Sequence, residues 1–175
     1  MVTLIEGNIV HQEVESIVNA ANNSLLGGGG VDGAIHQAAG PGLLKECREI
    51  GGCPTGEARV TLGYQLSCHW VIHTVGPIWS GGGKGEENLL ANCYRNCFAI
   101  VKERSIKSVA FPSISTGVYR FPKQKASKIA LLQTKKFLAT ATTQDNLERI
   151  TFVCFSQEDL SIYRESYSDI FPGSA

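Results

Sequence analysis

The chain has 175 residues, of which 43% are hydrophobic and 18% charged, and its sixteen basic and sixteen acidic side chains cancel. This length fits one domain with a sizeable core, and the charge balance disfavours a duplex nucleic-acid binder, which normally carries a basic excess. Neutrality does not exclude a small anionic ligand, because backbone N–H groups can hold an anion without net charge.

In the first half of the chain, short apolar or β-branched runs predict strands, and apolar residues at helical spacing predict helices. A break at Gly40-Pro41-Gly42 separates two helices, and Gly51-Gly52-Cys53-Pro54 ends the second. The predicted strands cover residues 2–5, 16–20, 58–64 and 70–75, and the predicted helices cover residues 31–39 and 43–50.

The second half alternates regularly between helix and strand. Helices are predicted over 86–104, 123–140 and 160–167, and strands over 108–111 and 149–155. Pro122 suits the first turn of the middle helix. Strands alternating with helices after an initial pair of strands predict an α/β fold, layered around a mixed, mostly parallel sheet, in a single domain over residues 1–175.

Cysteine and histidine spacing gives no sign of a metal site. The six cysteines include no Cys-x-x-Cys pair, although Cys93 and Cys97 share a helix face. His69 and His73 lie in an apolar, strand-like run, where a packed histidine is more common than a metal ligand. We therefore expect no structural metal, and reduced thiols.

The N-terminus lacks the basic flank and apolar run of a signal peptide, and no segment has the apolar length of a membrane span. A cytoplasmic protein without membrane contact is therefore the expectation. A small, net-neutral domain of this kind is compatible with a monomer.

A glycine-rich loop follows the second predicted strand. It contains four consecutive glycines at 27–30 and leads into a helix near Val31. Glycines accept positive φ, which lets backbone N–H groups converge on an anion, and the start of a helix adds its own N–H groups and dipole. The alternative is a flexible surface loop. Gly28-x-Gly30-x-x-Gly33 also fits the dinucleotide fingerprint, but the acid expected about 20 residues further on is absent.

A second loop, over residues 111–122, also leaves a buried strand and enters a helix. It carries small hydroxyl residues and Gly117 at the turn. Ligands of α/β sheets bind at the carboxyl ends of the strands, and two such loops can hold two phosphates, which indicates a diphosphate. Tyr119 and Phe121 either wall a sugar or pack on the core. A Walker A loop is excluded, because Gly83-Lys84-Gly85 lacks the following Ser or Thr.

Three polar residues flank the first loop: Asn19, Asn22 and Asp32. Acids in a first helical turn stabilise the helix dipole, so Asp32 has a structural explanation as well as a functional one. Asn22 is either a turn former or a ligand-binding residue.

These loops belong to a set of blocks that runs from the N-terminus to the last strand. The blocks are Gly7-Asn8-Ile9, Val18-Asn19-Ala20-Ala21-Asn22, and residues 27–36, 71–77 and 112–119. Together they resemble macrodomains of the MacroD type, and the match is specific only when they are taken together. The resemblance implies a three-layer α/β/α sandwich around a mixed, mostly parallel six-stranded sheet, with ADP-ribose lying in a cleft across the top.

The resemblance also implies roles for individual residues. The positions that match the adenine end of the ligand are Asn8, Ile9 and Phe155. The positions that match the loop around the diphosphate and distal ribose are Gly28, Gly29, Gly30 and Val31. The positions that match the second phosphate loop are Ser115, Thr116, Gly117, Val118 and Tyr119. The positions that match the pair needed for hydrolysis are Asn22 and Asp32.

One residue departs from the family pattern. The family usually has an aspartate at the position of Asn8. A carboxylate accepts a hydrogen bond from the adenine amino group with charge assistance, and an amide oxygen accepts it more weakly. This departure affects the affinity for adenine, not the chemistry at the other end of the ligand.

The implied activity is that of a hydrolase that needs no cofactor. It would remove the acetyl group of O-acetyl-ADP-ribose, or mono-ADP-ribose from Asp and Glu side chains of modified proteins. Asn22 would hold the ribose hydroxyls, Asp32 would orient or activate water, and Tyr119 would close the pocket. Since the residues supply no Ser-His-Asp or Cys-His nucleophile, direct attack by water is expected.

Two other classes of function remain as alternatives. One is a non-catalytic reader of ADP-ribosylated proteins, which the presence of both Asn22 and Asp32 disfavours. The other is a nucleotide-dependent redox enzyme, which the missing ribose-binding acid disfavours. Within the hydrolase class, ADP-ribose 1″-phosphate is a candidate for a side activity.

Overall fold

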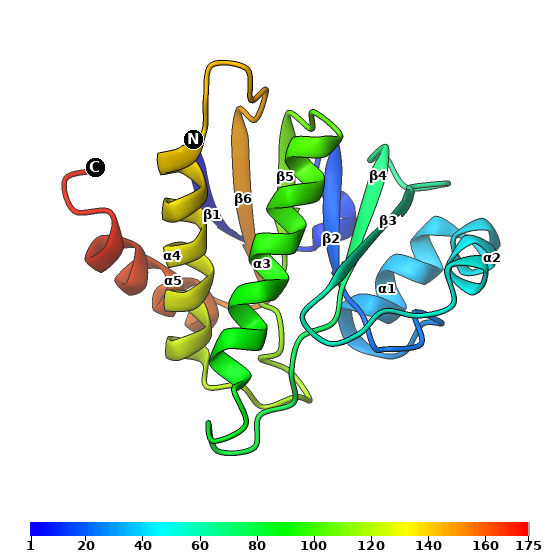
Figure 1. Cartoon of the computed structure of the whole chain (residues 1–175), viewed down its shortest axis with the longest axis horizontal. Helices are drawn as coiled ribbons and strands as arrows, with labels where there is room; N and C mark the ends of the chain where they lie inside the picture. The colour runs from blue at the N-terminus through cyan, green and yellow to red at the C-terminus, as the bar shows by residue number, and fades with distance from the viewer. Residues whose placement is uncertain (175) are drawn as a thin grey trace.

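A six-stranded sheet forms the centre of the structure, a computed structural model that describes residues 1–174 (Figure 1). The strand order is β1-β6-β5-β2-β4-β3; β3 pairs antiparallel with β4, and all other pairings are parallel. The strands are β1 (Val2–Glu6), β2 (Ser16–Ala20), β3 (Ala58–Leu62), β4 (Trp70–Thr74), β5 (Ser108–Phe111) and β6 (Arg149–Cys154). The helices are η1 (Ile9–His11), α1 (Gly30–Ala39), α2 (Pro41–Ile50), α3 (Glu86–Glu103), α4 (Lys123–Thr140) and α5 (Gln157–Ile170).

Helices cover both faces of this sheet and create two hydrophobic cores. Because successive strand residues point to opposite faces, Ile17 packs into the core under α1 and α2, and Val18 packs into the core under α3, α4 and α5. In Figure 1, α3 and α4 run side by side in front of the sheet, and α1 and α2 lie beside β3 and β4. The predicted three-layer α/β/α sandwich with a mixed, mostly parallel sheet is confirmed.

Three details of the sequence prediction were wrong. The first two strands are not a pair, because β6 and β5 lie between them. The break between the two helices is Gly40 alone, with a φ of 79°, and Pro41 already begins α2, where a proline gives up no hydrogen bond. His69 precedes β4 and is exposed, so only His73 belongs to the apolar strand.

The parallel strands end along one edge of the sheet, at the bottom of Figure 1. At this edge the chain leaves β2 toward α1 and leaves β5 toward α4, so the two loops singled out in the sequence lie at the same end of the sheet. Carboxyl ends of neighbouring parallel strands are where open α/β sheets bind ligands.

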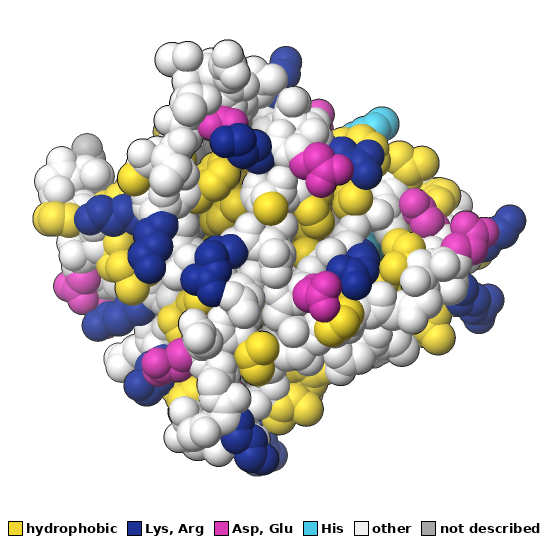
Figure 2. Space-filling view, viewed as in Figure 1, with side chains coloured by type: hydrophobic (Ala, Val, Ile, Leu, Met, Phe, Trp, Pro, Cys, Tyr) yellow, Lys and Arg dark blue, Asp and Glu magenta, His cyan; other side chains and the backbone are white. Residues whose placement is uncertain are grey.

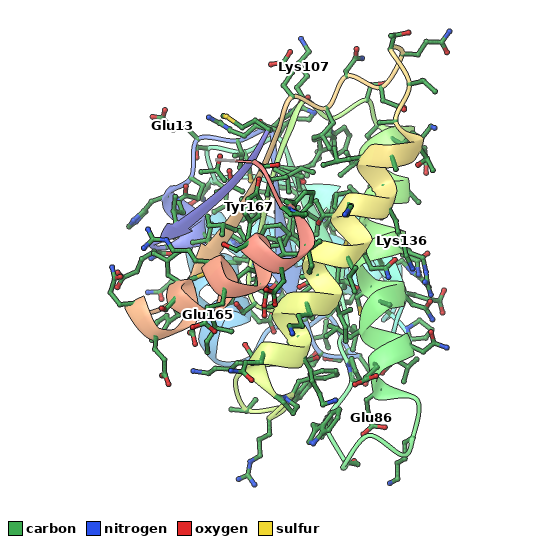
Figure 3. The ribbon with its side chains drawn as sticks, turned by 90° about the vertical axis from the view of Figure 1, so that its left-hand side faces the viewer. Glu13, Glu86, Lys107, Lys136, Glu165 and Tyr167 are labelled. Carbon is green, nitrogen blue, oxygen red and sulfur yellow. The ribbon has the colours of Figure 1, made fainter. Side chains whose placement is uncertain are left out.

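Another glycine-rich segment, residues 80–85, lies just before α3 and surrounds a carboxylate of the same chain. Glu86 accepts hydrogen bonds from the backbone N–H groups of Ser80 at 3.0 Å, Gly82 at 2.8 Å and Lys84 at 2.6 Å. The side chain lies at the lower end of α3 in Figure 3. These bonds, that of Ser80 above all, lower the pKa of Glu86 to about 2. The segment therefore binds an internal anion and helps to begin α3.

This geometry makes stability depend on the charge of Glu86. We expect Glu86→Gln to lower the melting temperature at pH 7 by roughly 3–6 °C, because an amide cannot accept from every N–H group without opposing one with its own NH2. The pKa is lower in the folded chain than the ordinary 4.5, so the contribution is complete above pH 4.5 and disappears as the pH falls toward 2.

Thermal unfolding of both proteins between pH 7 and pH 2.5 tests this expectation. The difference between wild type and Glu86→Gln should narrow below pH 4.5. Glu87→Gln is the matched control, since Glu87 is exposed and its carboxylate pairs with Lys125 at 3.2 Å instead of with backbone N–H groups. Equal melting temperatures for wild type and Glu86→Gln at pH 7 would contradict the role of the carboxylate.

Charged side chains of both signs lie on the face formed by α3 and α4, and basic ones predominate over α4 (Figure 2). Acidic partners lie near several of its lysines, as in Lys125–Glu87 at 3.2 Å and Lys102–Asp145 at 3.6 Å. Within residues 1–174, no helix combines the length and the apolar character that a bilayer crossing requires.

Candidate ligand-binding cleft

A cleft of about 470 Å³ opens at the carboxyl edge of the sheet, between the loop after β2 and the loop after β5. This volume suits a ligand the size of a nucleotide. The cleft is lined by Ala20, Ala21, Asn22, Gly28, Gly29, Gly30, Val31, Asp32, Gly76, Ser113, Ile114, Ser115, Gly117, Val118 and Tyr119. All the predicted site residues belong to this lining except Asn8, Ile9, Thr116 and Phe155.

The first loop is anchored in the core and ends at the start of a helix. Leu25 is fully buried, and its N–H donates to the Asn22 carbonyl at 3.1 Å. Beyond it, Gly27 and Gly30 adopt positive φ values of 90° and 59°. Helix α1 follows the N-cap Gly29, which has no capping side chain, so the first N–H groups of α1 have no partner within the helix. The loop is therefore anchored by Leu25, and it presents an anion-binding helix start to the cleft.

Asn22 and Asp32 approach each other across Gly28. A Cβ on Gly28 would lie 3.2 Å from Asp32 Oδ2 and 3.4 Å from Asn22 Nδ2. The Asn22 amide braces the loop, since Nδ2 donates to the Gly27 carbonyl at 2.8 Å and Oδ1 accepts from Ser24 at 2.7 Å. Asn22 is thus a loop former, as one reading of the sequence held, and it also lines the cleft.

Asp32 is a buried carboxylate at the cleft wall. The residue is only 5% exposed, and its Oδ1 accepts a hydrogen bond from Asn19 Nδ2 at 2.8 Å. His36, one turn further along α1, places Nε2 at 3.5 Å from Asp32 Oδ1. The sequence interpretation gave His36 no role, although its spacing of four from Asp32 on a helix places both on one face.

The second loop is folded tightly against the end of β4. Ser115 has a φ of 66°, and its carbonyl accepts from Phe121 N–H at 2.9 Å. A Cβ on Gly76 would lie 2.1 Å from Ser115 Oγ, so this approach requires a glycine after β4. The Thr116 hydroxyl donates to the Ser113 carbonyl at 3.0 Å, which turns that side chain back into the loop.

The two aromatic residues of this loop have different surroundings. Phe121 is 1% exposed and packs in the core, 4.8 Å from the Trp79 ring centroid. Tyr119 is half-buried and lines the cleft, and its carbonyl accepts from Trp79 N–H at 2.8 Å. Of the two residues considered as walls for a sugar, only Tyr119 is therefore in position.

Asn8, Ile9 and Phe155 lie beyond the cleft lining, in the segments that follow β1 and β6. Glu6 pairs with Cys154, so Asn8 and Phe155 follow neighbouring strand ends. Phe155 is 89% exposed, Ile9 is buried in the core, and Asn8 Oδ1 accepts from Val10 N–H at 3.1 Å. Along the strand order, the first loop, the second loop, Phe155 and Asn8 succeed one another. An elongated ligand can thus extend along this edge, and the adenine contacts stay a prediction.

The groups of the cleft that can attract an anion belong to the backbone. Within residues 1–174 no lysine or arginine lines it, and its titratable side chains are Asp32 and Tyr119. An anionic ligand would therefore be held by N–H groups of the two loops and the dipole of α1. In the same part of the chain, no three His, Cys, Asp or Glu side chains are grouped to hold a metal ion.

The fold and the cleft define a class of protein: an α/β/α sandwich with an anion-binding cleft at the carboxyl edge of its sheet. The family model described as "Macro domain" matches residues 18–130, more than half of the chain. The chain belongs to the macro domain family, which confirms the resemblance found in the sequence.

Relatives and solved structures agree with this assignment. A macro domain-containing protein of Methanosarcina mazei is 50% identical over 169 residues, which is 97% of this chain and 89% of that protein. The Homo sapiens protein named ADP-ribose glycohydrolase MACROD2 is 52% identical over 172 residues, which is 97% of this chain but 40% of that longer protein. A Trypanosoma brucei macrodomain, solved in complex with ADP-ribose, has a TM-score of 0.87 at 41% identity and covers 94% of this chain and 68% of its own.

Proposed function

We propose that this chain binds ADP-ribose in the cleft and hydrolyses an ester bond at the distal ribose. The observation that carries the proposal is the Asn22–Asp32 pair beside Gly28, a buried carboxylate and an amide at the end of an anion-binding loop. The name of the MACROD2 relative, an ADP-ribose glycohydrolase, supports hydrolysis of a linkage to ADP-ribose, and the ADP-ribose in the T. brucei macrodomain supports the ligand.

The two loops suggest how the ligand would lie. The diphosphate would bridge N–H groups at the start of α1 and in the second loop. The adenine would extend toward Asn8 and Phe155, and the distal ribose would lie between Asn22, Asp32 and Tyr119. Binding energy from the diphosphate and adenine would then fix the reacting ribose in one pose.

The Asp32 carboxylate is suited to bind and orient the attacking water. Its Oδ1 is held by Asn19, while Oδ2 faces Gly28 at the cleft lining. A water molecule bonded to Oδ2 would attack the ester carbonyl carbon, and Asp32 would accept or direct its proton. The bond between the acyl carbon and the ribose oxygen then breaks, releasing a carboxylic acid and ADP-ribose with a free hydroxyl.

Two substrate classes fit this chemistry: O-acetyl-ADP-ribose, and proteins that carry mono-ADP-ribose on Asp or Glu. Turnover of both should be measured side by side, with ADP-ribose binding as a control. We expect turnover of at least one. Binding without turnover of either would reject the hydrolase and favour a reader of ADP-ribosylated proteins.

The Asn8 position allows a separate test of the adenine contact. Asn8→Asp should tighten ADP-ribose binding by roughly 5-fold, because a charged acceptor makes a hydrogen bond about 1 kcal/mol stronger. Aspartate is also an effective N-cap, so the bond that Oδ1 accepts from Val10 is retained.

Calorimetry with ADP-ribose measures this effect. Asn146→Asp is the matched control, since it adds the same charge to an exposed loop at the opposite edge of the sheet. Unchanged or weaker binding by Asn8→Asp would mean that the side chain at position 8 does not accept from the adenine amino group.

A further inference from the structure

A row of buried polar side chains leads from the cleft wall into the sheet, on the face that α1 and α2 cover. Asn19 of β2 pairs in register with His73 of β4. Thr61 of β3 pairs with Val71, two residues before His73, and so points to the same face. Asn19, His73 and Thr61 are at most 1% exposed. Buried polar groups need hydrogen-bond partners, so their bonds constrain one another.

These residues form a continuous hydrogen-bonded chain that starts at Asp32. Asn19 Nδ2 lies 2.8 Å from Asp32 Oδ1 and 3.1 Å from His73 Nδ1. On the other side of the ring, His73 Nε2 lies 2.9 Å from Thr61 Oγ1, which in turn donates to the Leu62 carbonyl at 3.1 Å. With its two hydrogens, the Asn19 amide thus reaches both the Asp32 carboxylate and the His73 ring.

The partners assign the proton of the imidazole. Burial, and then the nearby His36, lower the pKa of His73 to about 3, so the ring is neutral and carries one proton. Since Nδ1 accepts from the Asn19 amide, the proton belongs to Nε2 and is donated to Thr61 Oγ1. The Thr61 hydroxyl can accept it, because its own hydrogen is directed to the Leu62 carbonyl. One amide hydrogen of Asn19 therefore points to Asp32, and from the other amide hydrogen onward every donor points away from Asp32.

The direction of these hydrogen bonds decides which end of the Asn19 amide faces Asp32. Asn19 Oδ1 is buried without a hydrogen bond in the described structure, so the amide oxygen does not hold the side chain in place. If His73 instead carried its proton on Nδ1, the ring would favour the reversed amide, with Oδ1 opposite the carboxylate. Two acceptors would then face each other, and Asp32 Oδ1 would lose the hydrogen bond that it accepts from Asn19.

We infer that His73 and Thr61 are positioning residues, which hold the Asn19 amide with its NH2 toward Asp32 and thereby keep that carboxylate oriented. This role rests on the proposed function, in which Asp32 binds the attacking water and accepts or directs its proton. Neither residue lines the cleft, and both act through Asn19.

Thr61→Val tests this inference, because it removes the hydroxyl with almost no change of shape. Within residues 1–174, the acceptor left for the Nε2 proton of His73 is then the Cys47 sulfur, a weak acceptor 4.0 Å away. We expect kcat for O-acetyl-ADP-ribose to fall about 10-fold, as for other groups that orient a functional residue, with KM and the Kd for ADP-ribose almost unchanged. Thr61→Ser should restore kcat.

Two further measurements separate positioning from general stability. Thr134→Val is the matched control: Thr134 is equally buried, but its hydroxyl donates to the Ala130 carbonyl within α4, so this variant should lose stability and keep kcat. The ¹⁵N spectrum of the His73 ring should report the Nε2–H tautomer in wild type and loss of that form in Thr61→Val.

The outcomes distinguish this role from the proposed function itself. Wild-type kcat in Thr61→Val, failure of Thr61→Ser to restore kcat, or an Nδ1–H tautomer in wild type would each overturn the positioning role. Absence of turnover by the wild-type protein would instead overturn the proposed hydrolase activity. The tautomer of His73 would still report whether the hydrogen bonds run from Asn19 to Thr61.

Discussion

Replacing Asp32 with alanine is expected to lower the turnover of O-acetyl-ADP-ribose by ~10²-fold or more, the contribution of a positioned general acid–base group. The carboxylate lies at the cleft wall with Oδ1 fixed by Asn19, so its loss removes the group that would direct water. ADP-ribose binding should not weaken, because the variant removes a negative charge beside an anionic ligand. Steady-state turnover and calorimetry measure the two effects separately.

Asp32→Asn is the sharper version of the same experiment. An asparagine keeps the shape of the side chain, and its carbonyl oxygen can still accept from Asn19 Nδ2, but it cannot accept a proton from water. The asparagine variant should therefore lose turnover about as severely as the alanine variant. Undiminished turnover in a folded Asp32→Asn would exclude proton transfer to this residue, and undiminished turnover in both variants would remove Asp32 from the mechanism.

Elements with strong local signals were predicted well. The strand Ser108–Phe111 and the helix Lys123–Thr140 have the predicted bounds, because a short buried run and a proline before the first turn are local features. Helix α5 was predicted from 160 to 167 but covers Gln157–Ile170. The Ser156 side chain caps it by accepting from Asp159 N–H at 3.2 Å, a start signal outside the apolar pattern. The short η1 was not predicted.

The candidate site was predictable where it consists of contiguous loops. Glycines and a helix start follow one another in the sequence, so the loop that contains Gly28 and Asp32 could be recognised by its order alone. The hydrogen-bonded residues behind Asp32 could not be recognised in this way. His73 is 54 residues from Asn19 in the chain and Thr61 is 12 residues from His73, and only the strand register brings the three together. A buried histidine in an apolar strand looks the same in sequence whether it merely packs or supports a site.

Gly33→Ala is expected to weaken ADP-ribose binding at least ~10-fold, because a misplaced phosphate loop loses several N–H contacts together. A Cβ at Gly33 would lie 2.4 Å from the Gly28 carbonyl oxygen, a distance that real Cβ atoms essentially never reach. That oxygen belongs to the backbone of the first loop and cannot rotate away as a side chain would. The loop must therefore shift at Gly28, between Asn22 and Asp32.

Two effects of this substitution oppose each other, and their sizes decide the result. Alanine inside α1 gains about 1 kcal/mol of helix propensity over glycine. Overpacking against fixed atoms costs typically ~1–3 kcal/mol, and displacement of the loop adds the loss of ligand contacts. The melting temperature should therefore fall modestly while binding falls strongly, a combination that calorimetry and thermal unfolding can resolve.

Gly83→Ala is the matched control for Gly33→Ala. Gly83 has no atom within 4 Å of an added Cβ, does not need a positive φ, and lies outside the cleft lining. It should leave binding unchanged. If Gly33→Ala also bound ADP-ribose normally, the position of Gly28 would not matter for the diphosphate, and the anion would have to be held by the second loop alone. The separation of the two glycine variants thus tests whether the first loop, rather than glycine content in general, forms the phosphate site.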